Sequence, residues 1–181
     1  MQTKETMMRV KPFAITLDVG TSLANRTGSW RTLKPVYVDR LPPCNAKCPA
    51  GEQCQAWLFH AQSGNYENAW KQIIEDNPFP AVMGRVCYHT CQGACNRNGI
   101  DEPVGINAVE RFLGDYALEK DWQLPVPAAD TGKRILIVGA GPAGLSAAYQ
   151  LRRLGHAVHV VESAEAAGGM MRYGIPKYRL P

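Results

Sequence analysis

The sequence predicts a mixed fold, in which a helical domain that carries every cysteine is followed by the first β-α-β unit of an α/β domain. Two observations predict this order. Apolar residues recur at helical spacing through the middle of the chain, and a strand-like apolar run at Arg134–Val138 leads directly into a glycine-rich turn. Within the 181 residues we expect four segments: an extended arm at 1–42, the helical domain at 43–122, a linker at 123–131 and the start of the α/β domain at 132–181.

The arm mixes Thr, Gly and Pro without a sustained period, and only Pro12–Leu17 has a strand-like pattern. Three helices with apolar residues on one face are predicted after it, at Gln53–Ala61, Tyr66–Asp76 and Ile106–Trp122. A Ser-Gly-Asn turn separates the first two, and Asn77-Pro78 ends the second. The aromatic residues of these helices are expected in the core. The linker contains two prolines and no periodicity, which disfavours a helix there.

The composition argues against several classes of protein. Hydrophobic residues make up 45% of the chain, which allows a packed core, and a net charge of +4 without a basic stripe argues against a nucleic-acid partner. No apolar run is long enough to span a membrane, and Met1–Lys11 is not followed by the apolar core and cleavage site of a secretory signal. We therefore expect a cytoplasmic protein, in whose reducing environment clustered cysteines are more often metal ligands than disulfides.

The six cysteines fall into two groups with short spacing, Cys44-x3-Cys48-Pro-x4-Cys54 and Cys87-x3-Cys91-x3-Cys95. Thiolates bind iron well, and an iron–sulfur cubane needs four ligands that converge from several directions. One loop with short spacings supplies two or three of these ligands, and a second loop closes the cage. Pro49 directly after Cys48 is typical of bacterial ferredoxins. The pattern therefore favours iron–sulfur ligation.

Other uses of the cysteines fit the spacing less well. Zinc sites usually contain Cys-x2-Cys pairs, and neither group has one. His89 lies between two cysteines, but at a poor spacing for zinc. A thioredoxin-type redox pair also needs Cys-x-x-Cys, and disulfides are rare in the expected compartment.

The glycine-rich turn follows the strand predicted at Arg134–Val138 and precedes a helix predicted at Leu145–Leu154 and a second strand at Ala157–Val161. This strand–turn–helix–strand order makes the Gly-x-Gly-x-x-Gly match specific for a Rossmann-type nucleotide site. Gly139 allows the tight turn, Gly141 removes a side chain that would block a pyrophosphate, and Gly144 lets the helix approach the strand. The N-terminus of the helix then faces the phosphates.

Glu162, at the end of the second predicted strand, can accept both ribose hydroxyls of an adenosine. A carboxylate there disfavours a 2′-phosphate, so FAD or NAD fits this turn better than NADP. The pair Gly168-Gly169 farther on suits a backbone that passes close to a ligand. The candidate cofactor-binding residues are those of the turn, the strand end and the paired-glycine loop: Gly139, Gly141, Pro142, Ala143, Gly144, Glu162, Ser163, Gly169, Met170 and Arg172.

Five stretches carry a specific resemblance to a known family: Cys44-x3-Cys48-Pro-Ala-Gly, Gly84-Arg-Val-Cys87-x3-Cys91-x-Gly-x-Cys95, Val104–Glu110, Val138-Gly-Ala-Gly-Pro-Ala-Gly-Leu145 and Gly168-Gly-Met-Met-Arg-Tyr-Gly-Ile-Pro176. On these stretches, residues from about 42 to 181 resemble the small subunit of glutamate synthase and its relatives, including the amino-terminal part of dihydropyrimidine dehydrogenase. The resemblance implies a helical domain with two [4Fe–4S] clusters, FAD in the first nucleotide fold and NAD(P)H in a later part that this chain does not contain.

The resemblance also implies the cluster ligands. Cys48, Cys87 and Cys91 look like three ligands of one cluster, with the side chain of Glu110 as the fourth. Cys44 and Cys95 look like ligands of the other cluster.

The chain departs from the family at three points. Val36 and Asp39 stand where the family has two more cysteines, and Cys54 is an additional cysteine. We therefore expect the cluster of Cys48, Cys87, Cys91 and Glu110 to be present. The cluster of Cys44 and Cys95 lacks two thiolates: either Cys54 or Asp39 substitutes as a ligand, or this second cluster is absent. The α/β fold stops after two predicted strands, so we expect it to be completed by a longer polypeptide or by another chain.

The resulting functional hypothesis is the electron-transfer part of an NAD(P)H-dependent oxidoreductase, which passes electrons between NAD(P)H, FAD and [4Fe–4S] clusters to a partner subunit or to later domains. The part in hand needs no acid–base or nucleophilic residue, and its four histidines lie in no triad-like context. Two alternatives stay open. One is a non-enzymatic iron–sulfur adaptor or redox sensor that docks a catalytic partner, and the other is a regulator that binds zinc and NAD.

Overall fold

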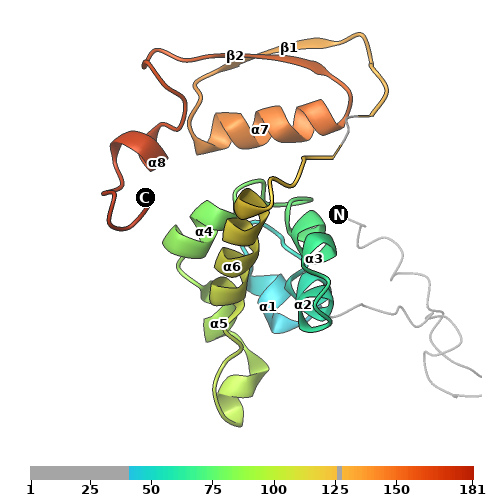
Figure 1. Cartoon of the computed structure of the whole chain (residues 1–181), viewed down its shortest axis with the longest axis vertical. Helices are drawn as coiled ribbons and strands as arrows, with labels where there is room; N and C mark the ends of the chain where they lie inside the picture. Colours follow the sequence, from blue (N-terminus) through green and yellow to red (C-terminus); the bar gives the residue numbers. More distant parts are fainter. Residues whose placement is uncertain (1–40, 126–127) are drawn as a thin grey trace, which may run out of the picture. The chain divides into compact units, whose positions relative to one another are not determined.

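The computed structural model describes residues 41–125 and 128–181 (Figure 1). The strand expected at Pro12–Leu17, and the positions Val36 and Asp39, lie outside the described residues. Within them, the element order is a series of helices followed by one β-α-β unit. No helix among these residues is long and apolar enough to cross a lipid bilayer.

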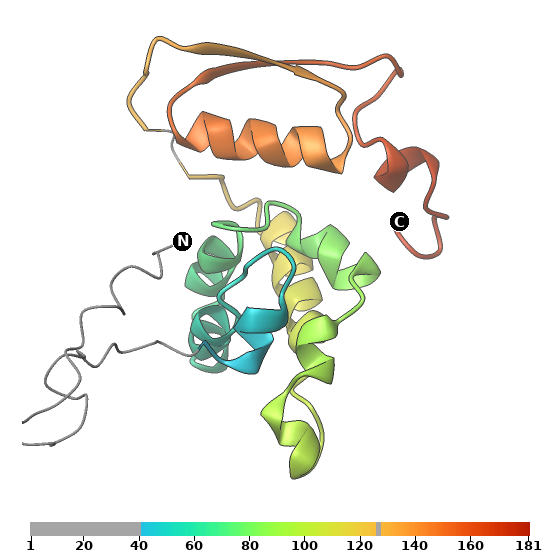
Figure 2. The same cartoon turned by 180° about the vertical axis from the view of Figure 1, so that it is seen from behind.

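The helical part contains the three expected helices, as α2 (Cys54–Gln62), α3 (Tyr66–Ile73) and α6 (Ile106–Glu119). Helices α2 and α3 form a hairpin, in which Gly64 takes the left-handed backbone (φ 73°) and the Asn65 side chain accepts the Asn68 N–H. The left-handed turn reverses the chain, and the capping bond starts α3. Figures 1 and 2 show the two helices side by side.

Shorter elements that the periodicity did not predict contain or flank five of the six cysteines. They are α1 (Pro43–Lys47), α4 (Pro80–Val86), α5 (Thr90–Gly93) and a 3₁₀ turn, η4 (Asn96–Gly99). Helices α1 and α4 begin with proline, whose fixed φ and missing N–H suit the first position of a helix. Elements of four to seven residues are too short to show a helical repeat of apolar residues.

The core of the helical part lies where α2, α3 and α6 meet. Trp57, Ile73 and Leu113 come one from each helix, and all three are fully buried. The expectation that the aromatic residues are buried is correct for Trp57 but wrong for Phe112, which is 46% exposed. Phe112 instead takes part in a surface stack with Tyr66 and Tyr116, in which aromatic edges and faces contact each other.

Helices α4 and α6 cross at two glycines. A Cβ on Gly84 would lie 2.6 Å from the Arg111 Cβ, and one on Gly114 would lie 2.6 Å from the Ala81 Cα. The backbones therefore approach more closely than any side chain at these positions allows. This crossing fixes how α4, which ends just before Cys87, sits on α6.

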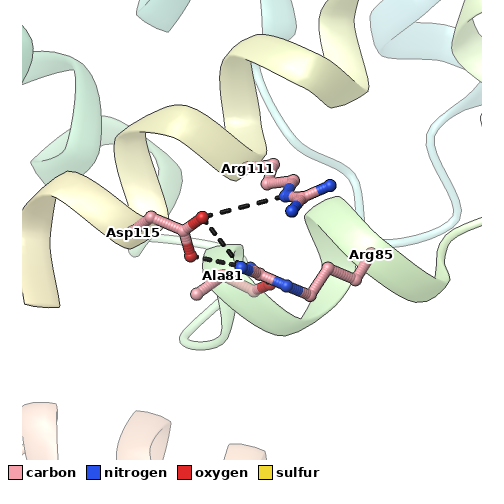
Figure 3. Close-up of polar contacts among 4 residues, drawn as sticks. All are labelled: Ala81, Arg85, Arg111 and Asp115. Carbon is pink, nitrogen blue, oxygen red and sulfur yellow. Dashed lines mark hydrogen bonds and ion pairs between the residues drawn. The ribbon is translucent and has the colours of Figure 1, made fainter. Parts of the chain in front are cut away.

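An ion pair joins the same two helices (Figure 3). The Arg85 guanidinium donates to both carboxylate oxygens of Asp115, at 2.7 and 2.8 Å, and also to the Ala81 carbonyl at 2.7 Å. Arg111 approaches the same carboxylate at 3.8 Å. The contact is bidentate and the Arg85 side chain is only 14% exposed. This pair therefore fixes the relative position of the two helices more firmly than an ordinary exposed ion pair would.

The β-α-β unit consists of β1 (Arg134–Val138), α7 (Pro142–Arg153) and β2 (Ala157–Val161). Both strands have the predicted bounds, and they pair in parallel from Arg134 opposite Ala157 to Val138 opposite Val161. Helix α7 covers one face of the pair (Figures 1 and 2). It starts at Pro142 instead of Leu145, because proline occupies its first position. A short helix that was not expected, α8 (Met170–Tyr173), follows β2.

Apolar side chains of the strands stay exposed. Leu136 is 62% and Val138 is 83% exposed, and among the described residues the sheet has only these two strands. Parallel strands are normally covered on both faces and flanked by others. The exposed apolar residues agree with the expectation of an incomplete α/β fold.

Candidate metal centre and nucleotide site

A cavity of about 300 Å³ lies within the helical part and is lined by four of the six cysteines. They come from three places. Cys48 follows α1, and Cys54 is the first residue of α2. Cys87 follows α4, and Cys91 lies in α5. Two carboxylates line the same cavity, and the rest of its wall is mainly apolar. The lining residues that carry soft or acidic ligands are Cys48, Glu52, Cys54, Cys87, Cys91 and Glu110.

The Cys48 sulfur lies among hydrogen-bond donors. The pKa of Cys48 is lowered to about 6, chiefly because the neighbouring Cys54 thiol donates a hydrogen bond to it. Backbone N–H groups, including those of Ala50 and Gly51, lower it further, whereas burial acts in the opposite direction. Gly51 has φ 77°, and this left-handed conformation belongs to the loop that wraps around the sulfur. Such N–H groups stabilise a thiolate, which is the form that binds metal.

The second cysteine segment is shaped in a similar way. The His89 N–H donates to the Cys87 Sγ at 3.4 Å, and His89 itself is left-handed at φ 57°. Cys91 is 9% exposed, and burial raises the pKa of its thiol to about 11. A buried neutral thiol of this kind is inert until a metal takes the place of its proton.

The two carboxylates share one buried partner. The Asn77 Nδ2 donates to an oxygen of Glu52 and to an oxygen of Glu110, each at 2.9 Å, and all three side chains are at most 6% exposed. Burial raises the pKa of Glu52 to about 7 and that of Glu110 to about 9. Neither carboxylate has a cationic partner among these contacts, so both are poised to be neutralised by a proton or by a metal.

Sequence reasoning found Glu110 but missed Glu52 and Asn77. A carboxylate oxygen of Glu52 and the sulfurs of Cys48 and Cys54 all lie within 4.8 Å of one another. An acidic residue inside a short loop between two cysteines was the available signal, but loop acids are usually solvated. Only the fold shows that Glu52 is buried.

The donor set fits a [4Fe–4S] cluster. A cubane takes four protein ligands, and this cavity offers four thiols and two carboxylates in an apolar wall with N–H groups directed at two of the sulfurs. Hydrogen bonds to cluster sulfurs and exclusion of solvent are the protein's main means of setting a cluster potential.

The other two cysteines, Cys44 and Cys95, do not line this cavity. Cys44 is half-buried and its thiol lies 3.6 Å from the Asn45 Oδ1. The pKa of Cys95 is lowered by the backbone N–H groups of Val104 and Arg97. Within residues 41–125 and 128–181 the structure brings no further group of ligands around these two thiols, whereas Cys54 lies beside Cys48.

The glycine-rich turn joins β1 to α7 as its sequence predicts. Gly139 has φ 99°, which favours glycine. A Cβ on Gly144 would lie 3.1 Å from the Gly139 carbonyl carbon and still closer to its oxygen, so only glycine lets α7 pack here. Pro142 and Ala143 form the first residues of α7, whose free N–H groups face the turn.

Glu162 lies beside this turn. Its carboxylate accepts the Ala164 N–H at 2.9 Å and the Ala140 N–H at 2.7 Å, and the Ser163 hydroxyl at 3.2 Å. The two backbone N–H groups lower the pKa of Glu162. The carboxylate is therefore ionised and fixed at the end of β2, where it was expected.

The paired glycines close over the turn. The Gly168 N–H donates to the Ala140 carbonyl at 2.8 Å, and a Cβ on Gly169 would lie 2.8 Å from the Gly141 Cα. Gly169 also has φ 50°. The structure shows a close approach between two loops, and the close approach to a ligand stays a prediction. Helix α8, with the candidates Met170 and Arg172, follows directly.

Comparison with known proteins finds a family match for each of the two segments. Residues 38–122 match the family described as dihydropyrimidine dehydrogenase domain II, 4Fe–4S cluster, and residues 137–178 match the NAD(P)-binding Rossmann-like domain. The small chain of glutamate synthase [NADPH] from Bacillus subtilis is 40% identical over 134 residues. This chain is a homologue of glutamate synthase small chains. The resemblance found in the sequence is therefore confirmed, as are a 4Fe–4S domain and a Rossmann-like domain.

Other relatives have different names. The β subunit of NADP⁺-dependent formate dehydrogenase from Moorella thermoacetica is 37% identical over 162 residues, and the NAD-dependent dihydropyrimidine dehydrogenase subunit PreT from Salmonella typhimurium is 38% identical over 141 residues. These alignments include 77% of this chain in both cases, and 74% for the B. subtilis protein. The chain spans 23%, 27% and 34% of the lengths of the Moorella, Bacillus and Salmonella proteins.

Proposed function

We propose that this chain is the electron-transfer portion of an NAD(P)H-dependent iron–sulfur flavoprotein oxidoreductase. The single observation that carries the proposal is the cavity that thiols from separate loops and two carboxylates line together. The relatives support it, because their names include NADPH-, NADP⁺- and NAD-dependent oxidoreductases that differ in substrate. Each of them shares with this chain a segment that makes up only part of its own length.

In this proposal Cys48, Cys87, Cys91 and Glu110 hold one [4Fe–4S] cluster. Three thiolates and one carboxylate supply the four ligands, and Cys54 stays beside Cys48 as a surplus thiol. The Met83, Val86 and Ile106 side chains on the wall exclude water from the cluster. Cys44 and Cys95 remain candidates for a second cluster whose other ligands lie outside the described residues.

The nucleotide turn is proposed to hold FAD. Gly139 and Gly141 leave room for the pyrophosphate at the N-terminus of α7, and the ionised Glu162 accepts the ribose hydroxyls. When bound, a flavin accepts two electrons from NAD(P)H and passes them on singly to clusters. We propose that the NAD(P)H site belongs to a further part of the assembly, that a partner subunit or later domains accept the electrons, and that the protein works in the cytoplasm. Segments 43–122 and 132–181 are the two domains involved.

Anaerobic purification of the chain tests the proposal. We expect iron and acid-labile sulfide in equal amounts and an electron paramagnetic resonance (EPR) signal after reduction with dithionite. Cys87→Ala should abolish this signal. Cys44→Ala is the matched control, because Cys44 does not line the cavity, and it should leave the signal of this cluster unchanged.

Three outcomes contradict the proposal in different ways. Zinc without iron and sulfide would select the regulator that binds zinc and NAD. A cluster that is present but takes no electrons from reduced FAD would select the redox-inactive adaptor. A colourless chain without iron refutes the proposal altogether.

A further inference from the structure

The buried side chain of Asn77 connects the two carboxylates of the cavity. Its Nδ2 donates to Glu52 Oε1 and to Glu110 Oε1, both at 2.9 Å, and its Oδ1 accepts the Phe79 N–H at 3.0 Å. Asn77 is 4% exposed, so it has no access to solvent for other partners. Both of its amide protons are used for carboxylates, and this use is unusual for a residue whose position suggests a simple turn.

The Glu110 carboxylate depends on this amide. Among the described residues, Glu110 makes its hydrogen bond to Asn77 and its second oxygen has no hydrogen-bond partner, whereas Glu52 also has the Trp57 side chain as a neighbouring donor. A buried carboxylate without a donor is strongly disfavoured, and two of them side by side repel each other when ionised. Since a glutamate side chain has several rotatable bonds, a fixed donor is what gives the Glu110 carboxylate a defined place on the cavity wall.

We propose that Asn77 is a positioning residue for the iron–sulfur cluster: by holding one carboxylate oxygen of Glu110, it presents the other to the iron that the three thiolates leave without a protein ligand. This inference rests on the proposed function, in which Cys48, Cys87 and Cys91 are those thiolates. It assigns to Asn77 a role in the fourth, oxygen-bound corner of the cluster, in addition to its turn between α3 and α4.

A structural role alone would come from the Oδ1, which accepts the Phe79 N–H in the turn that precedes α4. Asn77→Asp separates the two roles, because aspartate keeps that oxygen and the shape of the side chain but replaces the donor group by an acceptor. Asn77→Ser is a second variant, whose hydroxyl serves the turn and reaches at most one carboxylate. Asn107→Asp is the matched control: Asn107 is 9% exposed and donates to the Met83 carbonyl, not to a carboxylate.

The test uses the anaerobically purified chain and measures iron per chain and EPR spectra before and after mild oxidation. In Asn77→Asp we expect the oxygen-bound iron to be lost, so that the three-iron form rises about tenfold over wild type, the factor expected for one hydrogen bond to a charged group. Glu110→Ala should give the same three-iron spectrum. Asn77→Ser in the Glu110→Ala background should cause no further loss, because both changes act on one corner. Asn107→Asp should lower thermal stability but keep the wild-type spectrum.

The inference is overturned if Asn77→Asp and Asn77→Ser keep all the iron and the wild-type spectrum. It is also overturned if neither of these two variants folds, because the role of Asn77 in the turn then accounts for the whole effect. If only Asn77→Asp fails to fold, the iron content and spectrum of Asn77→Ser decide between the two roles. A wild-type chain without any cluster refutes the proposed function itself. A four-iron cluster in Glu110→Ala refutes both the ligand set and the role of Asn77.

Discussion

The α4–α6 crossing leads to a prediction whose size follows from the structure: Gly114→Ala should destabilise the chain and weaken its hold on the cluster. The added Cβ would lie 2.6 Å from the Ala81 Cα and 2.7 Å from the Pro80 carbonyl carbon, closer than real Cβ contacts. Because both neighbours are backbone atoms, no side-chain rotation relieves the clash. Helix α4 must move away from α6, and with it the chain that leads to Cys87.

The expected cost combines two opposing effects. Overpacking a tight contact costs about 1–3 kcal/mol, and the upper end applies where backbone must move. Replacing glycine by alanine inside a helix returns about 1 kcal/mol through helix propensity. We therefore expect Gly114→Ala to lower the free energy of unfolding by about 2 kcal/mol, measured by urea denaturation of the cluster-free chain, and to lower its iron content after reconstitution.

Gly93→Ala is the matched control. Gly93 is also helical, in α5 close to the cysteines, but a Cβ there meets nothing within 4 Å. It should be neutral or slightly stabilising. The reasoning is refuted if Gly114→Ala unfolds within about 0.5 kcal/mol of wild type, the range of ordinary surface substitutions.

Three further predictions concern the sites themselves. Gly169→Ala should weaken FAD binding at least tenfold in equilibrium dialysis. The φ of 50° at Gly169 disfavours any side chain, and the added Cβ would lie 2.8 Å from the Gly141 Cα in the glycine-rich turn. In the cluster-free chain, burial raises the pKa values of Glu52 and Glu110 from 4.5 to about 7 and about 9. Their contribution to stability is therefore complete below about pH 4.5 and lost as pH rises through the raised values, so Glu110→Gln should flatten the decline measured by urea denaturation. Cys54→Ala should keep the cluster and make its potential more negative by up to about 59 mV in an EPR redox titration, because a thiol beside the Cys48 sulfur is removed.

Each of these has its own contrary result. Unchanged FAD affinity in Gly169→Ala would mean that the paired-glycine loop does not border the cofactor. An equal decline of stability with pH in Glu110→Gln and wild type would mean that Glu110 is ionised in the cluster-free fold. Loss of iron in Cys54→Ala would make this thiol a ligand, with Asn107→Asp, which should lower stability but keep the cluster, as the control for general instability.

Much of the fold was predictable because its elements are long or carry a motif. Strands β1 and β2 have the predicted bounds, since an apolar β-branched run that leads into a glycine turn has few other interpretations. The helix hairpin and α6 were visible as apolar faces. Helices α4 and α5 were not, because their formation depends on a starting proline, a left-handed His89 and packing on α6, none of which leaves a periodic signal.

The sequence predicted the cysteines of the site better than it predicted the carboxylate and amide groups beside them. Spacing predicted clustered cysteines, and the resemblance added Glu110. Glu52 and Asn77 were missed because their burial results from the α2–α3 hairpin and the α4–α6 crossing, which bring together residues far apart in the sequence. Exposure of Phe112 was missed for a related reason: a helical face can be apolar and still lie at the edge of the core.

The crossing of α4 and α6 links stability to the metal site. Helix α4 leads into Cys87, α6 carries Glu110, and two glycines with the Arg85–Asp115 pair set the distance between the helices. A cluster that is held by ligands from both helices binds only the folded chain, and it therefore stabilises the folded state by mass action. Changes at the crossing should therefore cost more stability in the cluster-loaded chain than in the cluster-free chain. Changes in the exposed Glu67–Lys71 pair on α3, a helix that carries no proposed ligand, should cost the same in both.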